Sequence, residues 1–244
     1  MTLIYLGYIA QGLARVTEAL LEVRRLGHPH SLALVLTWAC WAECIGGSSH
    51  EAKRHADEMA TLSNEHGFLF WSAWALIFDG HLLSAFGQTQ ESLSLLSKGL
   101  SIHRATGAGI NTPLALVLLA EAYAKVGRVE DGLNCLAEAT QLVETTDERI
   151  VEADLSRLRG DLLNAIGDQS AAEQSFHQAL AVARKQSAKL WEVRASTSLA
   201  RLWRDQGKRT EARDLLAPIY GWFTEGFDTP VLQDAKALLE QLAA

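Results

Sequence analysis

The sequence predicts an all-α fold, a right-handed α-solenoid of antiparallel helical hairpins, for this chain of 244 residues. Three observations support the prediction. Only four residues are proline, and long stretches are rich in Ala, Leu, Glu and Arg, which lose little entropy in a helix. Small side chains recur at fixed distances from a series of evenly spaced glycines. These marker glycines repeat every 40 residues, at Gly7, Gly47, Gly87, Gly127, Gly167 and Gly207.

Each marker glycine is expected to end one helix in a left-handed cap conformation, which suits a residue without Cβ. A second helix then runs back antiparallel to the first. The residues five after the marker are small: Gly12, Ala52, Ser92, Gly132, Ala172 and Ala212. So are those seven before it: Cys40, Gly80, Ala120, Gly160 and Ala200. Small residues at both places let the two backbones approach closely, so the unit is a helical hairpin.

A second series of positions is expected to end the returning helix and to open the next hairpin. It contains Gly27, Gly67 and Gly107, followed in the later copies by Asp147 and Ser187. This second cap is therefore less uniform than the marker glycine.

The register divides the chain in order, and we expect residues 1–244 to form one solenoid. Residues 1–26 form a partial first hairpin, in which Met1 falls inside the first helix. Residues 31–225 form five full hairpins, and residues 230–242 form a capping helix.

Helix start signals agree with this register. Ser48 with Glu51, and Ser170 with Glu173, have the spacing of capping boxes. Pro230 suits the first position of the last helix.

The front end of the array has no comparable capping helix. Each unit of a solenoid buries its face only against its neighbours, so both ends need covering. We therefore expect the chain to be the carboxy-terminal piece of a larger protein, or to form a homodimer through its first helix.

One hairpin resembles the tetratricopeptide repeat. Residues 159–163, followed by Gly167, Ala172, Phe176 and Ala179, match that family's order of small, large, glycine, small, large and small positions. The 40-residue period is longer than the family's usual repeat, and its closing proline is absent. The resemblance implies a scaffold that binds a protein or peptide.

A second resemblance covers nearly the whole chain. Residues 118–123, 199–207 and 220–229 are similar to the carboxy-terminal repeat region of large bacterial signalling proteins. There, a class III nucleotide cyclase or a DNA-binding domain precedes an NTPase module and the repeats. The resemblance implies a regulatory role, with upstream domains of the same polypeptide as a possible partner. Neither a phosphate-binding loop nor a cyclase metal pattern occurs here, so such activities would belong to the parent protein.

Composition excludes several other classes. The net charge of −7 disfavours nucleic acid, whose binding needs a clustered basic face. The uncharged apolar runs are too short to span a membrane. Three cysteines do not form a disulfide framework, which favours a cytoplasmic protein. No nucleophile motif is present, so we expect no enzyme activity and no cofactor.

The candidate binding surface is the concave groove, lined by the first helix of each hairpin at positions thirteen, ten, six and three before the marker. The candidate groove residues are Trp41, Trp74, Ile77, Phe78, His81, Glu121, Asp161, Arg194, Arg201 and Arg204. The early part is apolar and aromatic, and the late part is charged. Residues 1–120 carry 16 charged side chains and residues 121–244 carry 35, which fits this change.

Alternative interpretations stay open for this surface. The early aromatic residues can be core, and the arginines can pair with Asp154, Asp161 and Asp205 on a solvated face. The apolar front half can instead dock on upstream domains. A groove that holds a small-molecule effector would make the chain a sensor. A deep aromatic pocket around Trp41 and Trp74 would favour the sensor, and an open, shallow groove would favour the scaffold.

A metal site is a further possibility in the first third of the chain. Six histidines gather there, His28, His30, His50, His55, His66 and His81. Cys40 and Cys44 lie one helical turn apart. Because Cys40 occupies a close-packing position and Cys44 shares its helix, burial explains both better, and we expect no metal.

Overall fold

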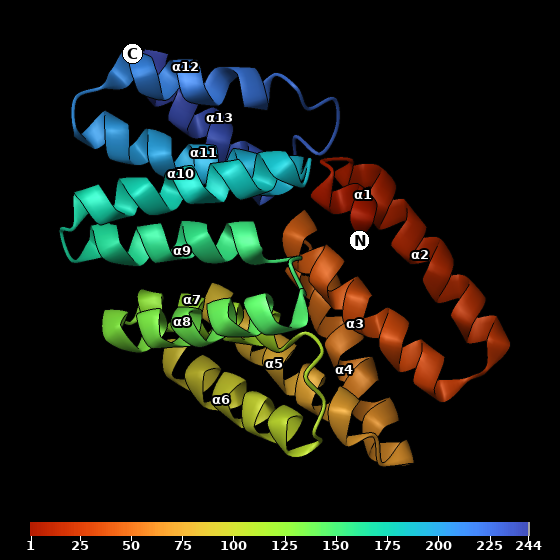
Figure 1. Cartoon of the computed structure of the whole chain (residues 1–244). Coiled ribbons are helices and arrows are strands. Elements are labelled where there is room, and N and C mark those ends of the chain that lie inside the picture. The colour runs from red at the N-terminus through yellow and green to blue at the C-terminus, as the bar shows by residue number, and fades with distance from the viewer. Residues whose placement is uncertain (244) are drawn as a thin grey trace.

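The computed structural model describes residues 1–243, which contain thirteen helices and no strand (Figure 1). The helices are α1 (Thr2–Tyr5), α2 (Ile9–Leu26), α3 (Pro29–Gly46), α4 (Ser49–His66), α5 (Leu69–Ala85), α6 (Thr89–Ala105), α7 (Thr112–Lys125), α8 (Val129–Thr146), α9 (Glu152–Ala165), α10 (Gln169–Lys185), α11 (Lys189–Asp205), α12 (Arg209–Tyr220) and α13 (Pro230–Ala243). The prediction of an all-α repeat solenoid is confirmed. Within this part of the chain, no helix is both long enough and apolar enough to cross a bilayer.

Successive helices pack as antiparallel hairpins, α3 with α4, α5 with α6, α7 with α8, α9 with α10, and α11 with α12. The first helix of each pair is called the inner helix and the second the outer helix. The grouping into a partial hairpin, five full hairpins and a capping helix within one domain is retained as our proposal.

The predicted left-handed glycines are confirmed by the backbone. The φ angles of the marker glycines are all positive, from 73° at Gly127 to 100° at Gly7. The second series has the same conformation even where glycine is absent, with φ of 59° at Asp147 and 55° at Ser187. The position therefore demands this backbone conformation whichever side chain occupies it.

The predicted capping boxes are wrong. Ser48 is the N-cap of α4, but its side chain makes no capping hydrogen bond. The N-cap of α10 is Asp168, whose carboxylate accepts a hydrogen bond from the backbone N–H of Ala171, and Ser170 lies inside the helix. The N-cap therefore lies two residues earlier than the serine spacing predicted, and the Asp168 carboxylate accepts from Ala171 where the capping box would have had Ser170 accept from Glu173. Pro230 is the first residue of α13, as predicted.

The small residues around each turn let the paired helices approach. A Cβ atom added at Gly160 of α9 would lie 2.4 Å from the ring of Phe176 on α10. At Gly80 of α5, it would lie 3.0 Å from a backbone oxygen of α6. Cys40 occupies the same position in α3, and its thiol donates to the carbonyl of Ala52, with the two atoms 3.3 Å apart.

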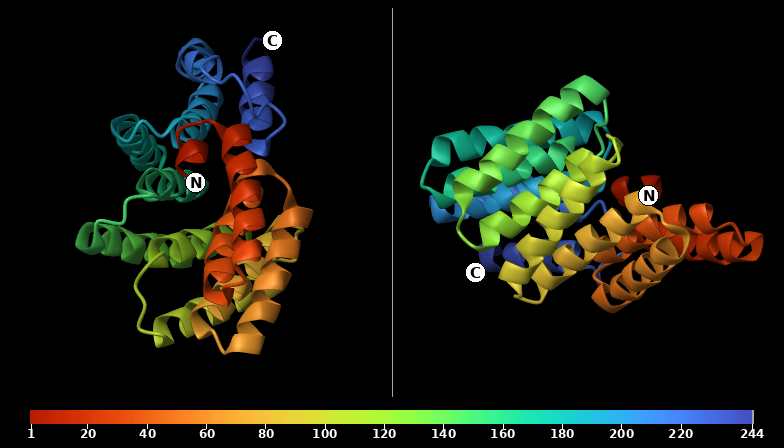
Figure 2. Two further views of the ribbon diagram at one scale, coloured as in Figure 1. Left: turned by 90° about the vertical axis from the view of Figure 1, so that its right-hand side faces the viewer. Right: turned by 90° about the horizontal axis from the view of Figure 1, so that it is seen from below.

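The two ends of the superhelix meet, which the sequence did not predict (Figure 2). Helix α1 packs against α11, and α13 packs against α3. The backbone N–H and side-chain amide of Gln11 donate to the Glu225 carboxylate over 3.1 and 3.0 Å. The Tyr8 and Trp222 rings lie 5.7 Å apart. The first turn of the chain therefore packs on its last hairpin, which covers α1 but leaves a groove open between α2 and α3.

Candidate functional site

Closure of the superhelix creates a central chamber of about 380 Å³. Its walls come from the inner helices α3, α5, α7, α9 and α11, together with α13. The side chains six positions before the marker glycine line it in four of the five full hairpins. These side chains are Trp41, His81, Glu121 and Arg201. The 40-residue register therefore brings distant parts of the chain to one cavity, because equivalent positions of successive inner helices face the same side.

One side of the chamber is apolar. It is formed by Trp41 and Ile45 of α3, Leu190 of α11 and Val231 of α13. The indole N–H of Trp41 donates to the Tyr5 hydroxyl across 2.8 Å. The indole and the ring of His81 meet edge to face with 6.2 Å between centroids. Trp41 is only 4% exposed, so it forms part of the chamber wall and does not project into the space.

The other side holds a network of three carboxylates and two guanidinium groups. Arg157 donates to Asp154 through Nε over 2.5 Å, to Glu121 through Nη2 over 3.4 Å, and to Asp161. Arg194 donates to Glu121 over 3.3 Å, and its Nη1 lies 3.2 Å from Asp154. With three negative and two positive groups, the network has one carboxylate in excess.

Burial and charge act against each other in this network. Burial alone would raise the pKa of Asp154, but the attraction of Arg157 and Arg194 outweighs it and lowers the pKa. Burial raises the pKa of Asp161 despite its contact with Arg157. Burial lowers the pKa of His81, so the neutral imidazole is the favoured form at the chamber wall.

The other two arginines predicted for the groove, Arg201 and Arg204, pair with acidic or amide groups. Arg201 donates to Asp234 of α13 at the chamber edge. Arg204 donates to Asp205 over 2.9 Å and to Gln241 over 2.6 Å, outside the chamber. Asp161 contacts Arg157 but is not itself a lining residue. Of the predicted charged residues, Glu121, Arg194 and Arg201 therefore line the chamber, whereas Asp161 and Arg204 do not.

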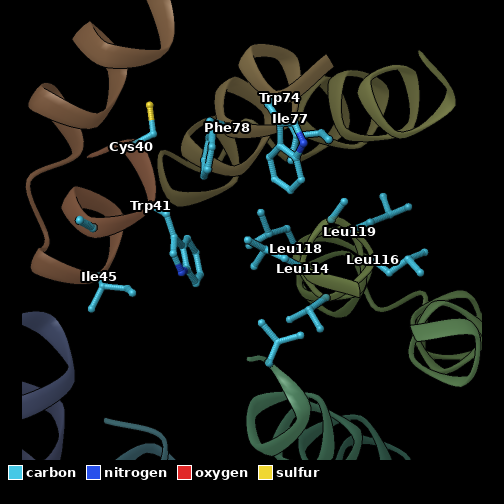
Figure 3. Packing of buried hydrophobic residues seen from close by; sticks show 14 of the residues in the cluster. Cys40, Trp41, Ile45, Trp74, Ile77, Phe78, Leu114, Leu116, Leu118 and Leu119 are labelled. Atoms are coloured by element: carbon cyan, nitrogen blue, oxygen red, sulfur yellow. The ribbon is translucent and has the colours of Figure 1, made fainter. Parts of the chain in front are cut away.

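Three predicted apolar anchors belong to the core, which corrects our expectation. Trp74, Ile77 and Phe78 of α5 are 0% exposed. Figure 3 shows them gathered with the leucines of α7. Helix α5 packs against α3, α4, α6 and α7, so almost every side of it is covered. The interpretation of the early aromatic residues as core holds for these three.

Sequence reasoning missed several chamber residues. Leu190, Pro230, Val231 and Asp234 line the chamber, and Tyr5 supports its Trp41 wall. None lies on the four repeat positions used to predict the groove. The participation of Pro230, Val231 and Asp234 depends on the packing of α13 against α3, for which the sequence contains no periodic signal.

The histidine-rich first third gathers no metal ligands. Within residues 1–243, no three His, Cys, Asp or Glu side chains converge as a metal site would require. Burial raises the pKa of the Cys44 thiol to about 12, so this thiol stays protonated at neutral pH.

Comparison with known proteins adds an independent line of evidence. Residues 111–185 match the family pattern of the tetratricopeptide repeat. A MAU2 chromatid cohesion factor homolog of Nematostella vectensis is 28% identical over 152 residues. The match covers 61% of this chain but only 23% of that protein, so the chain spans about a quarter of the length of this curated relative.

Solved structures share the fold at low sequence identity. BtubC of P. vanneervenii has a TM-score of 0.61 at 15% identity, covering 96% of this chain and 89% of its own. A Rap protein complexed with Competence and Sporulation Factor has a TM-score of 0.69 at 18% identity, covering 86% and 66%. A Pyrococcus horikoshii signal transduction ATPase with a tetratricopeptide repeat sensor has a TM-score of 0.59 at 14% identity, covering 94% and 38%. At such identities these similarities establish the fold alone.

The 40-residue hairpins, the left-handed glycines at their turns and the matched repeat pattern agree. Residues 111–185 of this chain therefore match the tetratricopeptide repeat, and residues 1–243 as a whole have the fold of a helical-repeat solenoid.

Proposed function

We propose that this chain is a protein-interaction scaffold that binds a peptide segment of a partner protein in the central chamber. The observation that supports the proposal is the convergence of equivalent inner-helix side chains, Trp41, His81, Glu121 and Arg201, on one cavity. A binding site needs an apolar surface with a few placed polar groups, and the chamber has both. We assign it binding and not catalysis.

The chamber chemistry favours a segment that is both apolar and polar. An apolar side chain can contact Ile45, Leu190 and Val231 on one side. Polar groups of the segment can exchange with the Arg201–Asp234 pair, whose side chains are 40% and 51% exposed. Because this pair is partly solvated, displacing it costs less than disturbing the buried Asp154–Arg157 pair.

A similar fold supports this choice. The Rap protein of similar fold was solved in complex with Competence and Sporulation Factor. We transfer from it only the idea that a helical repeat of this fold can bind a ligand.

Selection from a random peptide library on the immobilised chain tests the proposal. Peptides selected on the wild type should bind Arg201→Glu at least about tenfold more weakly, since the change reverses a charge at the chamber edge. Arg213→Glu makes the same charge change on the exposed side of α12 and serves as the control. If no peptide is enriched, or if selected peptides bind both variants equally, the chamber is not the peptide site.

A second candidate function is sensing of a small-molecule effector. The observation in its favour is closure, because α13 and the five inner helices surround the chamber. The Pyrococcus horikoshii ATPase, whose repeats are described as a sensor, has a similar fold. Thermal-shift screening against metabolites separates the two candidates, since a ligand of the folded state raises the melting temperature. A metabolite that stabilises the wild type but not Arg201→Glu would favour sensing.

We also propose, from the sequence resemblance alone, that the chain serves a cytoplasmic bacterial signalling protein and contacts its upstream domains. The gene context of the chain tests this. If the same reading frame encodes a cyclase, DNA-binding or NTPase module, co-purification of that fragment with this chain is expected. An isolated reading frame would contradict it.

A further inference from the structure

Two side chains that line the central chamber, His81 of α5 and Glu121 of α7, lie next to each other without a hydrogen bond between them. They are 20% and 21% exposed. Within residues 1–243, neither ring nitrogen of His81 takes part in a hydrogen bond, and Glu121 accepts its two hydrogen bonds through Oε1 alone. The imidazole of His81 and the Oε2 oxygen of Glu121 can therefore bind a group that enters the chamber.

The distance between these two groups suits an inserted amide. His81 Nδ1 and Glu121 Oε2 are 4.0 Å apart, whereas an N–H···O hydrogen bond measures about 2.9 Å. A primary amide has its oxygen and nitrogen about 2.2 Å apart, because both are bonded to one trigonal carbon. Two slightly divergent hydrogen bonds of ordinary length therefore connect such an amide with groups that are 4.0 Å apart.

The hydrogen-bonding character of the two groups also matches a primary amide. A carboxylate oxygen only accepts, so Glu121 Oε2 needs a donor. Burial lowers the pKa of His81, and nearby Lys125 and Arg194 add to this effect while Glu121 opposes it, so the ring is neutral and one of its nitrogens donates. A primary amide supplies an N–H and a carbonyl oxygen on the same side. A backbone amide does not, because the N–H and C=O of a trans peptide bond point in opposite directions.

The surrounding charges disfavour a charged group in this place. Arg157 and Arg194 lie 3.4 and 3.3 Å from Glu121 Oε1, and Lys125 is a third cation close enough to affect the pKa of His81. An ammonium or guanidinium group at Glu121 Oε2 would be repelled by these three cations, and a carboxylate would be repelled by Glu121 itself. A neutral amide avoids both penalties.

The wall beside the pair is apolar and does not compete for the amide. The rings of Trp41 and His81 meet edge to face with 6.2 Å between centroids. The indole N–H of Trp41 already donates to the Tyr5 hydroxyl over 2.8 Å, so the ring presents only apolar surface. Ile45 lies on the same helix one turn farther along (Figure 3). This wall suits the methylene groups of a side chain that ends in an amide.

Given that the chamber binds a peptide segment, as proposed, we infer that the segment presents an asparagine or glutamine side chain to His81 and Glu121. The amide N–H donates to Glu121 Oε2, and the amide carbonyl oxygen accepts from His81 Nδ1. These two residues therefore determine which peptides bind, because a side chain without an amide leaves both groups unpaired in a partly desolvated site.

Peptides selected on the wild-type chain from a random library are the probe, and they should share an Asn or Gln at one position. In the tightest-binding peptide, replacement of Gln by Met, or of Asn by Leu, should weaken binding at least about tenfold, because two hydrogen bonds are lost. Replacement by Glu or Asp should weaken it at least as much, because the new carboxylate would face Glu121. Fluorescence anisotropy with labelled peptides measures these affinities and needs no variant of the chain.

His81→Phe tests the site from the protein side, because it removes the donor and keeps an aromatic ring against Trp41. The affinity ratio between the amide peptide and its apolar counterpart should fall at least about threefold. His177→Phe is the matched control. The His177 ring also lies near a carboxylate and an indole, with 3.9 Å to Glu173 and 6.0 Å to the Trp203 centroid, but outside the chamber. This variant should keep the wild-type ratio, and circular dichroism of both should match the wild type.

Failure of the amide site is distinguishable from failure of peptide binding. Selected peptides that bind Arg201→Glu more weakly than the wild type, yet lack Asn and Gln or tolerate their replacement, would overturn the amide site and leave peptide binding intact. An amide preference that His81→Phe leaves unchanged would do the same, as would a preference for a charged side chain. No enriched peptide, or equal binding to the wild type and Arg201→Glu, would overturn both proposals.

Discussion

At the scale of single residues, Gly160 is an informative test of the hairpin contact. A Cβ atom at position 160 would lie 2.4 Å from the nearest atom of the Phe176 ring, so any larger residue there would clash with the ring. Gly160→Leu should lower the free energy of unfolding by about 1–3 kcal/mol, through overpacking of the contact between α9 and α10. Urea unfolding measures the change. Adding Phe176→Leu should restore part of the loss, and a Gly160→Leu protein as stable as the wild type would contradict the contact.

His103 predicts a pH dependence of stability. It is fully buried, with Nε2 3.0 Å from the carbonyl oxygen of Ile110, and burial lowers its pKa from 6.5. Below pH 6.5 the unfolded chain binds a proton that the folded chain does not bind. The free energy of unfolding should therefore fall as the pH drops from 6.5 toward the lowered pKa, and His103 should contribute no pH dependence above that range.

The variant His103→Gln isolates this contribution, because the amide can still donate to Ile110 but does not titrate in this range. Urea unfolding between pH 7.5 and pH 5 should show a smaller loss of stability in the variant than in the wild type. Equal slopes in the two proteins would mean that His103 is protonated without cost in the folded state.

At the scale of secondary-structure elements, the start of α10 depends on Asp168. Its Oδ1 accepts the backbone N–H of Ala171 over 3.0 Å. Asp168→Ala should lower the free energy of unfolding by about 1 kcal/mol, because that N–H loses its partner. Ser170→Ala is the matched control and should change stability little, since Ser170 lies within the helix. If Ser170→Ala lowered the free energy of unfolding more than Asp168→Ala, the predicted capping box of Ser170 and Glu173 would be supported instead.

The turn after α10 offers a stabilising change. Ser187 has φ of 55°, a conformation that favours glycine, and three other hairpins have glycine at this position. Ser187→Gly should raise the free energy of unfolding by about 0.5–1 kcal/mol, since relief of the strain outweighs the greater freedom of glycine in the unfolded chain. Thermal unfolding measures it. Gly167→Ala, at φ of 86°, should act in the opposite direction.

At the scale of the whole molecule, closure couples elements that are distant in the chain. Tyr5 contacts Trp41 of α3 through its hydroxyl and Trp191 of α11 through its ring, with 5.5 Å between ring centroids. Tyr5→Ala should therefore reduce hydrogen-exchange protection in α3 and α11 together while leaving α7 and α8 unchanged. Leu26→Ala, at a residue 75% exposed, is the control. A loss of hydrogen-exchange protection confined to α2 and α3 would indicate an open solenoid, in which each helix is coupled only to its nearest neighbours.

Much of the fold can be read from individual residues of the sequence. The glycines from Gly7 to Gly207 permit a left-handed turn every 40 residues, because a residue without Cβ meets no steric penalty at positive φ. Trp41, His81, Glu121 and Arg201 fall on one face because equal spacing from a repeated turn places side chains at equal angles. The sequence by itself therefore determined the hairpins, their register and part of the chamber wall.

Only the tertiary structure decided which of these residues are accessible and how the chamber is completed. Trp74 and Trp41 look alike in sequence, yet α5 is covered by four helices and Trp74 is core. Asp234 and Val231 reach the chamber because α13 packs on α3. Small changes in hairpin stacking accumulate along a superhelix, so the meeting of its ends depends on every interface at once and on no local pattern.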